Sequence, residues 1–428
     1  MRTPRWAPPL LAVAGFLGGN GAQAAELTAT QALGKLIFFD TQLSINRNQS
    51  CATCHAPGVG WTGPDQAINA AGSVYAGSIH DRFGDRKPPS SAYSTQSPVL
   101  HNQQKNPRKE AVFVGGHFWD GRATGERLGS AAAEQAQGPF LNPVEQALPS
   151  AACVVHRVCS GAYWALARAV LEADACNIGW TADPCTPQAA GGRLPPADAG
   201  LVAGTYDAIA RAIAAYEASP ESDAFTSKFD HVAKGKARFT AEEQRGRRLF
   251  EGKGKCGNCH VIETSGGTGP LFTDFTYDNL GLPRNPANPA YTADPAFVDR
   301  GLGGYLEGRT DYQAHAAANL GKHKVPSLRN VDLRPEPGFV KAYGHNGYFK
   351  SLKGIVHFYN TRDTKPACPG RPDGRGYTEA EALAGKCWPA PEVAQNVNRR
   401  ELGNLGLTAA EEDAIVAFMK TLSDNYGP

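Results

Sequence analysis

Two copies of the motif Cys-x-x-Cys-His stand out among the residues that could do chemistry. They are Cys51-Ala52-Thr53-Cys54-His55 and Cys256-Gly257-Asn258-Cys259-His260. Two thiols at this spacing can form thioether bonds to the two vinyl groups of a porphyrin, which places the following histidine beneath the iron. The sequence therefore predicts two covalently bound c-type haems, with His55 and His260 as proximal iron ligands.

A zinc ribbon and a redox-active dithiol are the alternative readings of these cysteine pairs. A zinc ribbon would combine both pairs into one site with four ligands, yet the two motifs lie far apart and each has its own histidine. A redox-active dithiol does not need that histidine. Haem attachment is the one reading that uses every residue of both motifs.

The first 24 residues have the pattern of an export signal. Arg2 and Arg5 precede an apolar stretch over residues 6–17, and Ala22-Gln23-Ala24 matches a small-residue cleavage site. The alternative is a membrane anchor, but the apolar stretch is shorter than the ~20 residues that a membrane span needs. We expect cleavage after Ala24 and a mature protein without a membrane span in an oxidising compartment.

Six further cysteines are not part of the haem motifs, and an even number in an exported protein suggests disulfide bonds. They are Cys153, Cys159, Cys176, Cys185, Cys368 and Cys387. The sequence leaves their connectivity open. Cys368 with Cys387 is the simplest pair, because both lie in one loop-like segment near the C-terminus.

Similar helices must position the two haem motifs, because residues 33–38 and 246–250 each combine a glycine with a bulky apolar end. Thr240 and Glu243 have the spacing of a capping box, and Thr408 and Glu411 repeat it before the last helix. Residues 206–216 carry an apolar stripe at helical spacing. We predict a mostly α-helical protein in which long irregular loops connect two cytochrome c-like haem domains.

The predicted domains follow the signal peptide at residues 1–24. The N-terminal haem domain spans residues 25–225 and the C-terminal one residues 236–428, with a polar stretch between them. The chain has 43 Lys and Arg against 41 Asp and Glu, so no single-sign field exists to attract nucleic acid or anionic lipid. A dedicated nucleic-acid binder is therefore not expected.

Several motifs resemble those of the bacterial dihaem cytochrome c peroxidases and MauG, a family in which MauG oxidises residues of a partner protein. The resemblance covers nearly the whole mature chain and implies a periplasmic enzyme. It rests on Phe38-Phe39-Asp40, Phe118-Trp119-Asp120-Gly121-Arg122, Glu134-Gln135-Ala136-Gln137-Gly138-Pro139, Asn142-Pro143-Val144-Glu145, Lys324-Val325-Pro326-Ser327-Leu328-Arg329-Asn330 and His345-Asn346-Gly347.

The resemblance implies that the haem on His55 binds hydrogen peroxide, with Gln135, Pro139 and Glu145 on its distal side. Breaking the O–O bond needs a group that takes a proton from one oxygen and returns it to the other, which a partly buried carboxylate such as Glu145 can do. Gln135 could orient the peroxide, and Pro139 would restrict the pocket. The plain alternative for Glu145 is a capping or paired carboxylate on a loop.

Trp119 resembles the tryptophan that conducts electrons between the haems of this family, although a tryptophan can also be simple core. The expected electron donor is a small cytochrome c or cupredoxin, which would make the protein a peroxidase, or a protein side chain, which would make it MauG-like. The competing class is a non-enzymatic dihaem electron carrier, which needs no distal carboxylate.

The sixth ligand of the C-terminal haem is expected to be a tyrosine rather than a methionine. Only two methionines exist, and Met419 lies on the apolar face of the last helix. The position that resembles the MauG ligand is Tyr359, and an anionic phenolate favours oxidised iron. His357, Tyr343 and Tyr348 are the competing candidates.

Two positions depart from the family pattern. His80 lies near the place where some of these peroxidases keep a removable distal histidine, so it is either a labile ligand or a loop histidine. The family's calcium-binding asparagine corresponds to Lys87, whose charge would repel the ion. Calcium binding would then depend on backbone carbonyls near Arg334.

Overall fold

The computed structural model describes residues 26–103, 112–172, 174–186, 196–262, 269–372 and 374–427. The predicted signal peptide lies outside these residues. The described chain is mostly helical, as predicted, and its strands form two short antiparallel pairs. These are β1 (His101–Gln103) with β2 (Val112–Val114), and β3 (Tyr277–Asp278) with β4 (His323–Lys324).

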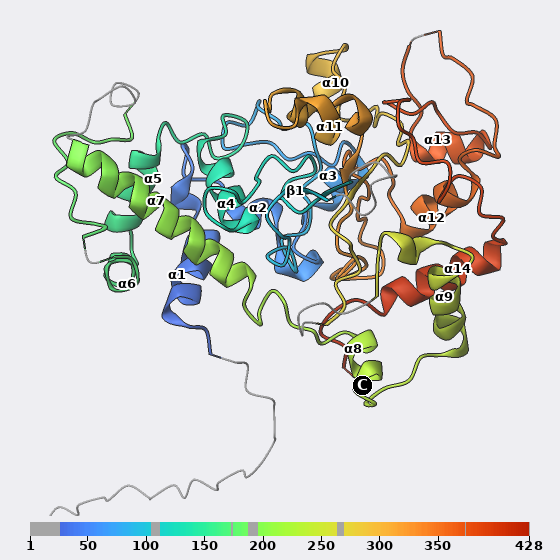
Figure 1. The fold of residues 1–428 in the computed structure, drawn as a ribbon, viewed down its shortest axis with the longest axis horizontal. Coiled ribbons are helices and arrows are strands. Elements are labelled where there is room, and N and C mark those ends of the chain that lie inside the picture. The colour runs from blue at the N-terminus through green and yellow to red at the C-terminus, as the bar shows by residue number, and fades with distance from the viewer. Residues whose placement is uncertain are drawn as a thin grey trace, which may run out of the picture.

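Two crossed helix pairs organise the molecule, one in each half of the chain (Figure 1). In the N-terminal half α1 (Ala29–Phe38) packs on α7 (Pro196–Glu217), and in the C-terminal half α9 (Ala241–Glu251) packs on α14 (Ala409–Lys420). The glycine that recurs in the sequence marks each crossing. A Cβ atom at Gly34 would lie 1.9 Å from the Ala212 oxygen, and one at Gly246 would lie 1.8 Å from the Ala414 oxygen.

In each crossed pair, one haem motif follows the first helix along the chain. After α1 the chain forms α2 (Cys51–Cys54), and after α9 it forms the 3-10 turn η4 (Cys256–Asn258). The predicted capping boxes at Thr240 and Thr408 are present and start α9 and α14. The sequence therefore builds the same local unit twice.

The other helices have between 5 and 11 residues. They are α3 (Gln66–Ala70), α4 (Ala131–Leu141), α5 (Ala151–Ser160), α6 (Trp164–Val170), α8 (Lys228–Ala233), α10 (Pro289–Ala293), α11 (Gly301–Glu307), α12 (Leu352–Thr361) and α13 (Glu379–Ala384). Further 3-10 turns are η1 (Thr41–Leu43), η2 (Pro57–Val59), η5 (Gln313–His315) and η6 (Ala317–Asn319).

Most of the buried apolar residues belong to one of two large hydrophobic cores. The first contains residues between Leu33 and Tyr216, and the second contains residues between Phe229 and Leu422. A small third core packs β2 against α11. None of the described helices is both long enough and apolar enough to cross a membrane.

Disulfide bonds use all six cysteines outside the haem motifs. The predicted pair Cys368–Cys387 is confirmed. Cys153–Cys185 and Cys159–Cys176 are two more bonds, and they hold α5 and the segment after α6 against the first core. The four cysteines that remain free are those of the two Cys-x-x-Cys-His motifs.

Candidate active site

The first motif faces a cavity, here called the N-terminal cavity, with about 1280 Å³ of empty volume that is partly open to solvent. Cys51, Cys54 and His55 line it together with Gln135, Pro139 and Glu145. A second, C-terminal cavity of about 1650 Å³ is lined by Cys256, Cys259 and His260. The structure thus brings each motif to its own cavity.

In both motif histidines the ring nitrogen Nδ1 lies beside a main-chain oxygen. His55 Nδ1 lies 3.3 Å from the Trp61 oxygen, and His260 Nδ1 lies 2.8 Å from the Phe272 oxygen. A carbonyl oxygen only accepts, so Nδ1 carries the proton and Nε2 keeps its lone pair. Burial lowers the pKa of His55 to about 4 and also lowers the pKa of His260, which keeps both rings in the neutral form that binds iron.

The two cavities fit two c-type haems. Each has a pair of thiols outside any disulfide, a neutral imidazole, and enough adjoining volume for a planar group. Burial raises the pKa of Cys54 and Cys256 to about 12, so without a bound group these sulfurs are uncharged thiols. The donor set therefore matches thioether attachment and axial histidine ligation.

The three predicted distal residues come from α4 and the turn after it. Gln135 and Pro139 are four residues apart, so they lie on one face of α4. Glu145 follows the helix, and its Oε1 accepts a hydrogen bond of 2.8 Å from Asn142 Nδ2. Burial raises the pKa of the Glu145 carboxyl, while the charge of Arg122 opposes this rise. Such a carboxyl can both accept and donate a proton.

A further buried carboxyl group in the N-terminal cavity was not predicted. Glu217, the last residue of α7, is buried and lines this cavity near Cys51. Burial raises its pKa to about 8, and Asp223 adds to the rise. No periodicity or motif around Glu217 distinguishes it from an ordinary helix-terminal glutamate, so only the packing of α7 on α1 could reveal it.

Tyr359 lines the C-terminal cavity from α12, together with Cys256, Cys259 and His260. Among the described residues, none forms a hydrogen bond with its hydroxyl group. Burial raises the pKa of the Tyr359 phenol, so ionisation to phenolate would require a bound cation such as iron.

The competing ligand candidates differ from Tyr359 in their surroundings. His357 Nδ1 lies 2.9 Å from the Glu412 carboxylate, and neither His357 nor Tyr348 lines the C-terminal cavity. Tyr343 lines it, but its hydroxyl group already contacts Arg334 and the Val331 oxygen. Met419 is buried in the second core, and it also lines this cavity.

Trp119 lies between the two cavities. It is 8 % exposed and lines both cavities. Lys87, Pro89 and Ser90 also line both cavities. One indole thus provides a single-residue contact from one cavity to the other.

The two positions that depart from the family pattern differ in their surroundings. His80 is exposed, approaches Asn48, and is not among the described residues that line the N-terminal cavity. Lys87 is partly buried, and its Nζ donates to Thr62 Oγ1 and the Pro88 oxygen. Arg334 bonds to Asp332, the Phe339 oxygen and Tyr343. Calcium binding stays a prediction.

Comparisons with known proteins agree on one family. A family profile described as di-haem cytochrome c peroxidase matches residues 28–238. The methylamine utilization protein MauG of Paracoccus denitrificans is 35 % identical over 94 % of this chain and 90 % of its own. A cytochrome-c peroxidase of Denitromonas iodatirespirans is 28 % identical over 92 % of this chain and 81 % of its own.

Solved structures give the same result. The crystal structure of the diheme peroxidase BthA from Burkholderia thailandensis is similar, with a TM-score of 0.68 and 30 % sequence identity. The match covers 92 % of this chain and 86 % of that one. The fold described above is therefore that of a diheme peroxidase.

Proposed function

Because this chain belongs to the di-haem cytochrome c peroxidase family, whose members carry two haems, we propose that it reduces hydrogen peroxide in the N-terminal cavity. The overall reaction converts one peroxide, two electrons and two protons into two waters. The observation that carries this proposal is that Glu145, Gln135 and Pro139 line the same cavity as His55. A plain electron carrier would not need a proton-exchanging carboxyl there.

In this proposal Cys51, Cys54 and His55 would hold a haem, whose iron would supply the redox chemistry of peroxide reduction. Glu145 would take a proton from one peroxide oxygen and deliver it to the other, which would leave as water. Gln135 orients the peroxide by hydrogen bonding, and Pro139 limits the space beside it. Asn142 holds the Glu145 carboxyl in place.

Electrons would reach the N-terminal cavity through Trp119 from the haem held by Cys256, Cys259 and His260, with Tyr359 as its sixth ligand. A tyrosinate ligand lowers the reduction potential, which makes this haem a poor acceptor from a small cytochrome c. We therefore favour a protein side chain as electron source, as in a MauG-like enzyme. The second candidate is a cytochrome c or cupredoxin donor.

The proposed compartment is the periplasm. Three disulfides among the described residues support an oxidising environment, in keeping with the export signal predicted for residues 1–24. Fractionation of cells that express the full chain, followed by N-terminal sequencing of the mature protein, tests both the compartment and the cleavage after Ala24.

Peroxide added to the resting ferric protein tests the function. A MauG-like enzyme should change its haem spectrum at once, whereas a peroxidase that requires activation should respond only after partial reduction. Absence of any spectral response in both states would contradict the proposal and favour a carrier. Electron paramagnetic resonance of the resting protein should show one high-spin and one low-spin ferric centre.

A further inference from the structure

Residues 59–73, here called the bridging segment, contact both haem sites. The segment follows the first Cys-x-x-Cys-His motif, and its Trp61 oxygen lies 3.3 Å from His55 Nδ1. Gly60 and Thr62 of the same segment line the C-terminal cavity. The contacts that hold this segment in place therefore position the His55 site relative to the C-terminal cavity.

The bridging segment has little side-chain charge with which to bind the rest of the chain. Asp65 is its one charged residue, and it is exposed. The Asp65 carboxylate accepts hydrogen bonds from the main-chain nitrogens of Ala67 and Ile68 and so caps α3. Polar contacts of the segment with the C-terminal half therefore use main-chain oxygens and uncharged side chains.

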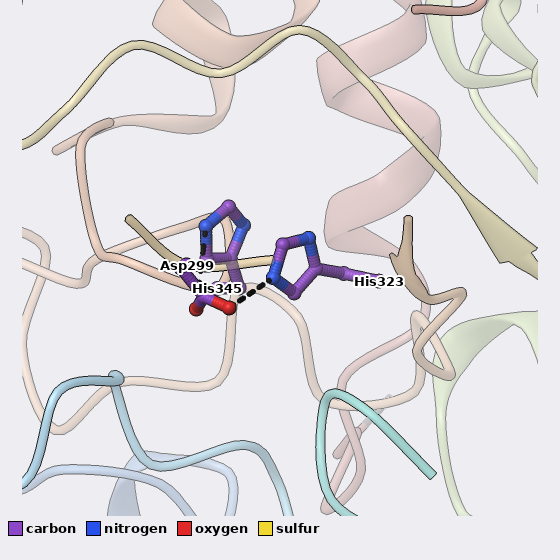
Figure 2. A group of neighbouring side chains, drawn as sticks. All are labelled: Asp299, His323 and His345. Carbon is purple, nitrogen blue, oxygen red and sulfur yellow. Dashed lines mark ion pairs between the residues drawn. The ribbon is translucent and has the colours of Figure 1, made fainter. Parts of the chain in front are cut away.

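A neighbouring stretch of the N-terminal half is instead joined to the C-terminal half by a buried ion pair. Arg86 Nε and Nη2 each donate a hydrogen bond of 2.7 Å to Asp299, which lies beside the stacked rings of His323 and His345 (Figure 2). The Lys87 main-chain nitrogen donates to the His345 oxygen at 2.8 Å. The bridging segment offers no buried charged group for a bidentate pair of this kind.

Four oxygen atoms surround the side-chain nitrogen of Lys350. They are the main-chain oxygens of Asn69, Ala71 and Gly347 at 2.8, 2.7 and 2.6 Å, and Ser73 Oγ at 2.9 Å. These lengths are typical of charge-assisted hydrogen bonds. Three of the four oxygens belong to the bridging segment, whereas Lys350 lies in the C-terminal half just before α12. The Lys350 side chain thus joins the two halves.

Lys350 keeps its positive charge at neutral pH. Burial lowers the pKa of its ammonium group to about 8, and the charge of Glu379 partly offsets this effect. The four oxygens around Nζ are all uncharged. The ammonium group therefore lies in a site of the kind that carbonyl and hydroxyl oxygens provide for a bound cation.

A second lysine of the C-terminal half, Lys341, also donates to the bridging segment. Its Nζ lies 2.6 Å from the Val59 oxygen and 2.7 Å from the Leu333 oxygen, with the Asn330 oxygen at 3.3 Å. Lys341 is 4 % exposed. Burial and neighbouring cations lower its pKa well below the usual range, so we assign it only the role of a hydrogen-bond donor, which both protonation states can fill.

A calcium ion does not fit at the carbonyl oxygens near Arg334, where the sequence would place it. Calcium takes about six to eight oxygen ligands. The Leu333 and Asn330 oxygens already surround Lys341 Nζ, so an ion could reach them only by displacing that nitrogen. The Arg334 guanidinium, which donates to the Phe339 oxygen, would also repel the ion.

We propose that the Lys350 ammonium group is a built-in cation that fastens the bridging segment to the C-terminal half, with Lys341 as a second donor, so that no calcium ion is needed there. The inference rests on the proposed function only where it treats the two cavities as haem sites that exchange electrons. Both lysines are positioning residues, because they act through the segment that contacts His55. Loss of either nitrogen removes donors from main-chain oxygens of the segment, which should then open more often.

Hydrogen exchange of the purified dihaem protein, followed by mass spectrometry, tests this positioning role. The amides of Asn69, Ala71 and Ser73 bond to oxygens within the bridging segment, so their exchange reports its opening. We expect Lys350→Met to speed this exchange by about 10-fold or more, because buried oxygens lose their donor. Equal exchange in wild type and Lys350→Met would overturn the proposal.

Two further variants make the exchange test specific. Lys341→Met should also speed exchange in the bridging segment. If it does not fold, Lys350→Met decides the test, because Lys350 is less deeply buried. Lys35→Met removes one partner of a surface pair with Glu221 and should leave the exchange unchanged.

Lys350→Ala separates the charge of the side chain from its size. The substitution removes a propylammonium group, so added propylammonium chloride should restore slow exchange in this variant. 1-Propanol at the same concentration, with sodium chloride to match the ionic strength, should not restore it. Equal restoration by both compounds would show that the site needs volume rather than a cation, and would overturn the proposal.

Elemental analysis and a calcium chelator test whether calcium is needed. We expect no stoichiometric calcium and the same exchange with and without the chelator. Stoichiometric calcium whose removal opens the bridging segment would overturn the proposal. Peroxide reactivity is measured separately. A wild-type protein that does not respond to peroxide, but whose bridging segment depends on Lys350, would contradict the proposed function and leave this inference standing.

Discussion

The indole Nε1 of Trp119 donates a hydrogen bond of 2.9 Å to the main-chain oxygen of Lys87, and both residues line both cavities. This bond fixes the plane of the indole ring between the two haem sites. A carbonyl oxygen is too weak a base to take the indole proton, so an oxidised Trp119 would keep it.

Replacing Trp119 by phenylalanine should slow electron exchange between the two haems. A phenyl ring is harder to oxidise than an indole and does not bond to Lys87. Rapid mixing with peroxide should then show a normal change at the haem on His55 and a delayed change at the haem on His260. Unchanged kinetics at both haems would exclude Trp119 from the electron path.

Glu145→Gln should slow the reaction with peroxide by about 100- to 10,000-fold, the range typical of lost acid–base catalysis. In the wild-type protein the rate of the fast phase should increase as pH rises through the Glu145 pKa, because only the ionised carboxylate can accept a proton. Burial raises this pKa. The variant should lose this dependence.

Two further variants make the Glu145 test specific. Glu251→Gln alters an exposed glutamate on α9 and should react at the wild-type rate. Glu217→Gln alters another buried carboxyl of the N-terminal cavity. If Glu217→Gln loses the fast reaction and Glu145→Gln keeps it, the acid–base assignment belongs to Glu217.

Tyr359→Phe should change the low-spin signal of one haem in electron paramagnetic resonance, because the phenolate ligand is lost. Met419→Leu is the rival test, since Met419 lines the same cavity and this core exchange is expected to cost less than about 1.5 kcal/mol. Its spectrum should match the wild type. A changed spectrum in Met419→Leu alone would reverse the ligand assignment.

Gly246→Ala should destabilise the protein by about 1–3 kcal/mol or more, because its methyl group would collide with the Ala414 oxygen where α9 crosses α14. Gly204→Ala is a matched control in α7, where an added Cβ meets no atom within 4 Å. Helix propensity predicts a gain of about 0.5–1 kcal/mol there. Denaturant unfolding of the haem-loaded variants measures both values.

Asp230→Asn should destabilise the protein by about 3–5 kcal/mol, because it leaves the buried Arg329 guanidinium without its counter-charge. Burial opposes ionisation of Asp230, but Arg329 outweighs it and lowers the pKa of this carboxyl. The stabilisation is thus complete above the unfolded-state pKa, near 3.9, and is lost as pH falls through the lower folded-state pKa.

The free energy of unfolding, measured between pH 3 and pH 7, checks this dependence. The wild-type protein should lose the stability of this ion pair in acid, and Asp230→Asn should show no such loss. Asp413→Asn removes one partner of an exposed pair with Lys353 and should cost less than about 1 kcal/mol. Equal stability losses in the two variants would show that the buried pair contributes no more than a surface one.

Local features of the chain could be predicted because their physical cause is local. The spacing in Cys-x-x-Cys-His is fixed by the geometry of haem attachment, and the capping boxes at Thr240 and Thr408 satisfy backbone groups within three residues. The short loop between Cys368 and Cys387 likewise favoured their pairing. The distal residues and Tyr359 required the family resemblance as well.

Only the tertiary structure decided which residues meet across long sequence distances. Three features follow from the packing of whole elements. They are the crossing of α9 on α14, the position of the Glu217 carboxyl in the N-terminal cavity, and the stacking of His323 on His345. No local period or motif marks these residues, because a contact between distant segments depends on the shapes and burial of everything between them. The sequence determined the chemistry that each haem site could perform, and the fold determined which charges surround it.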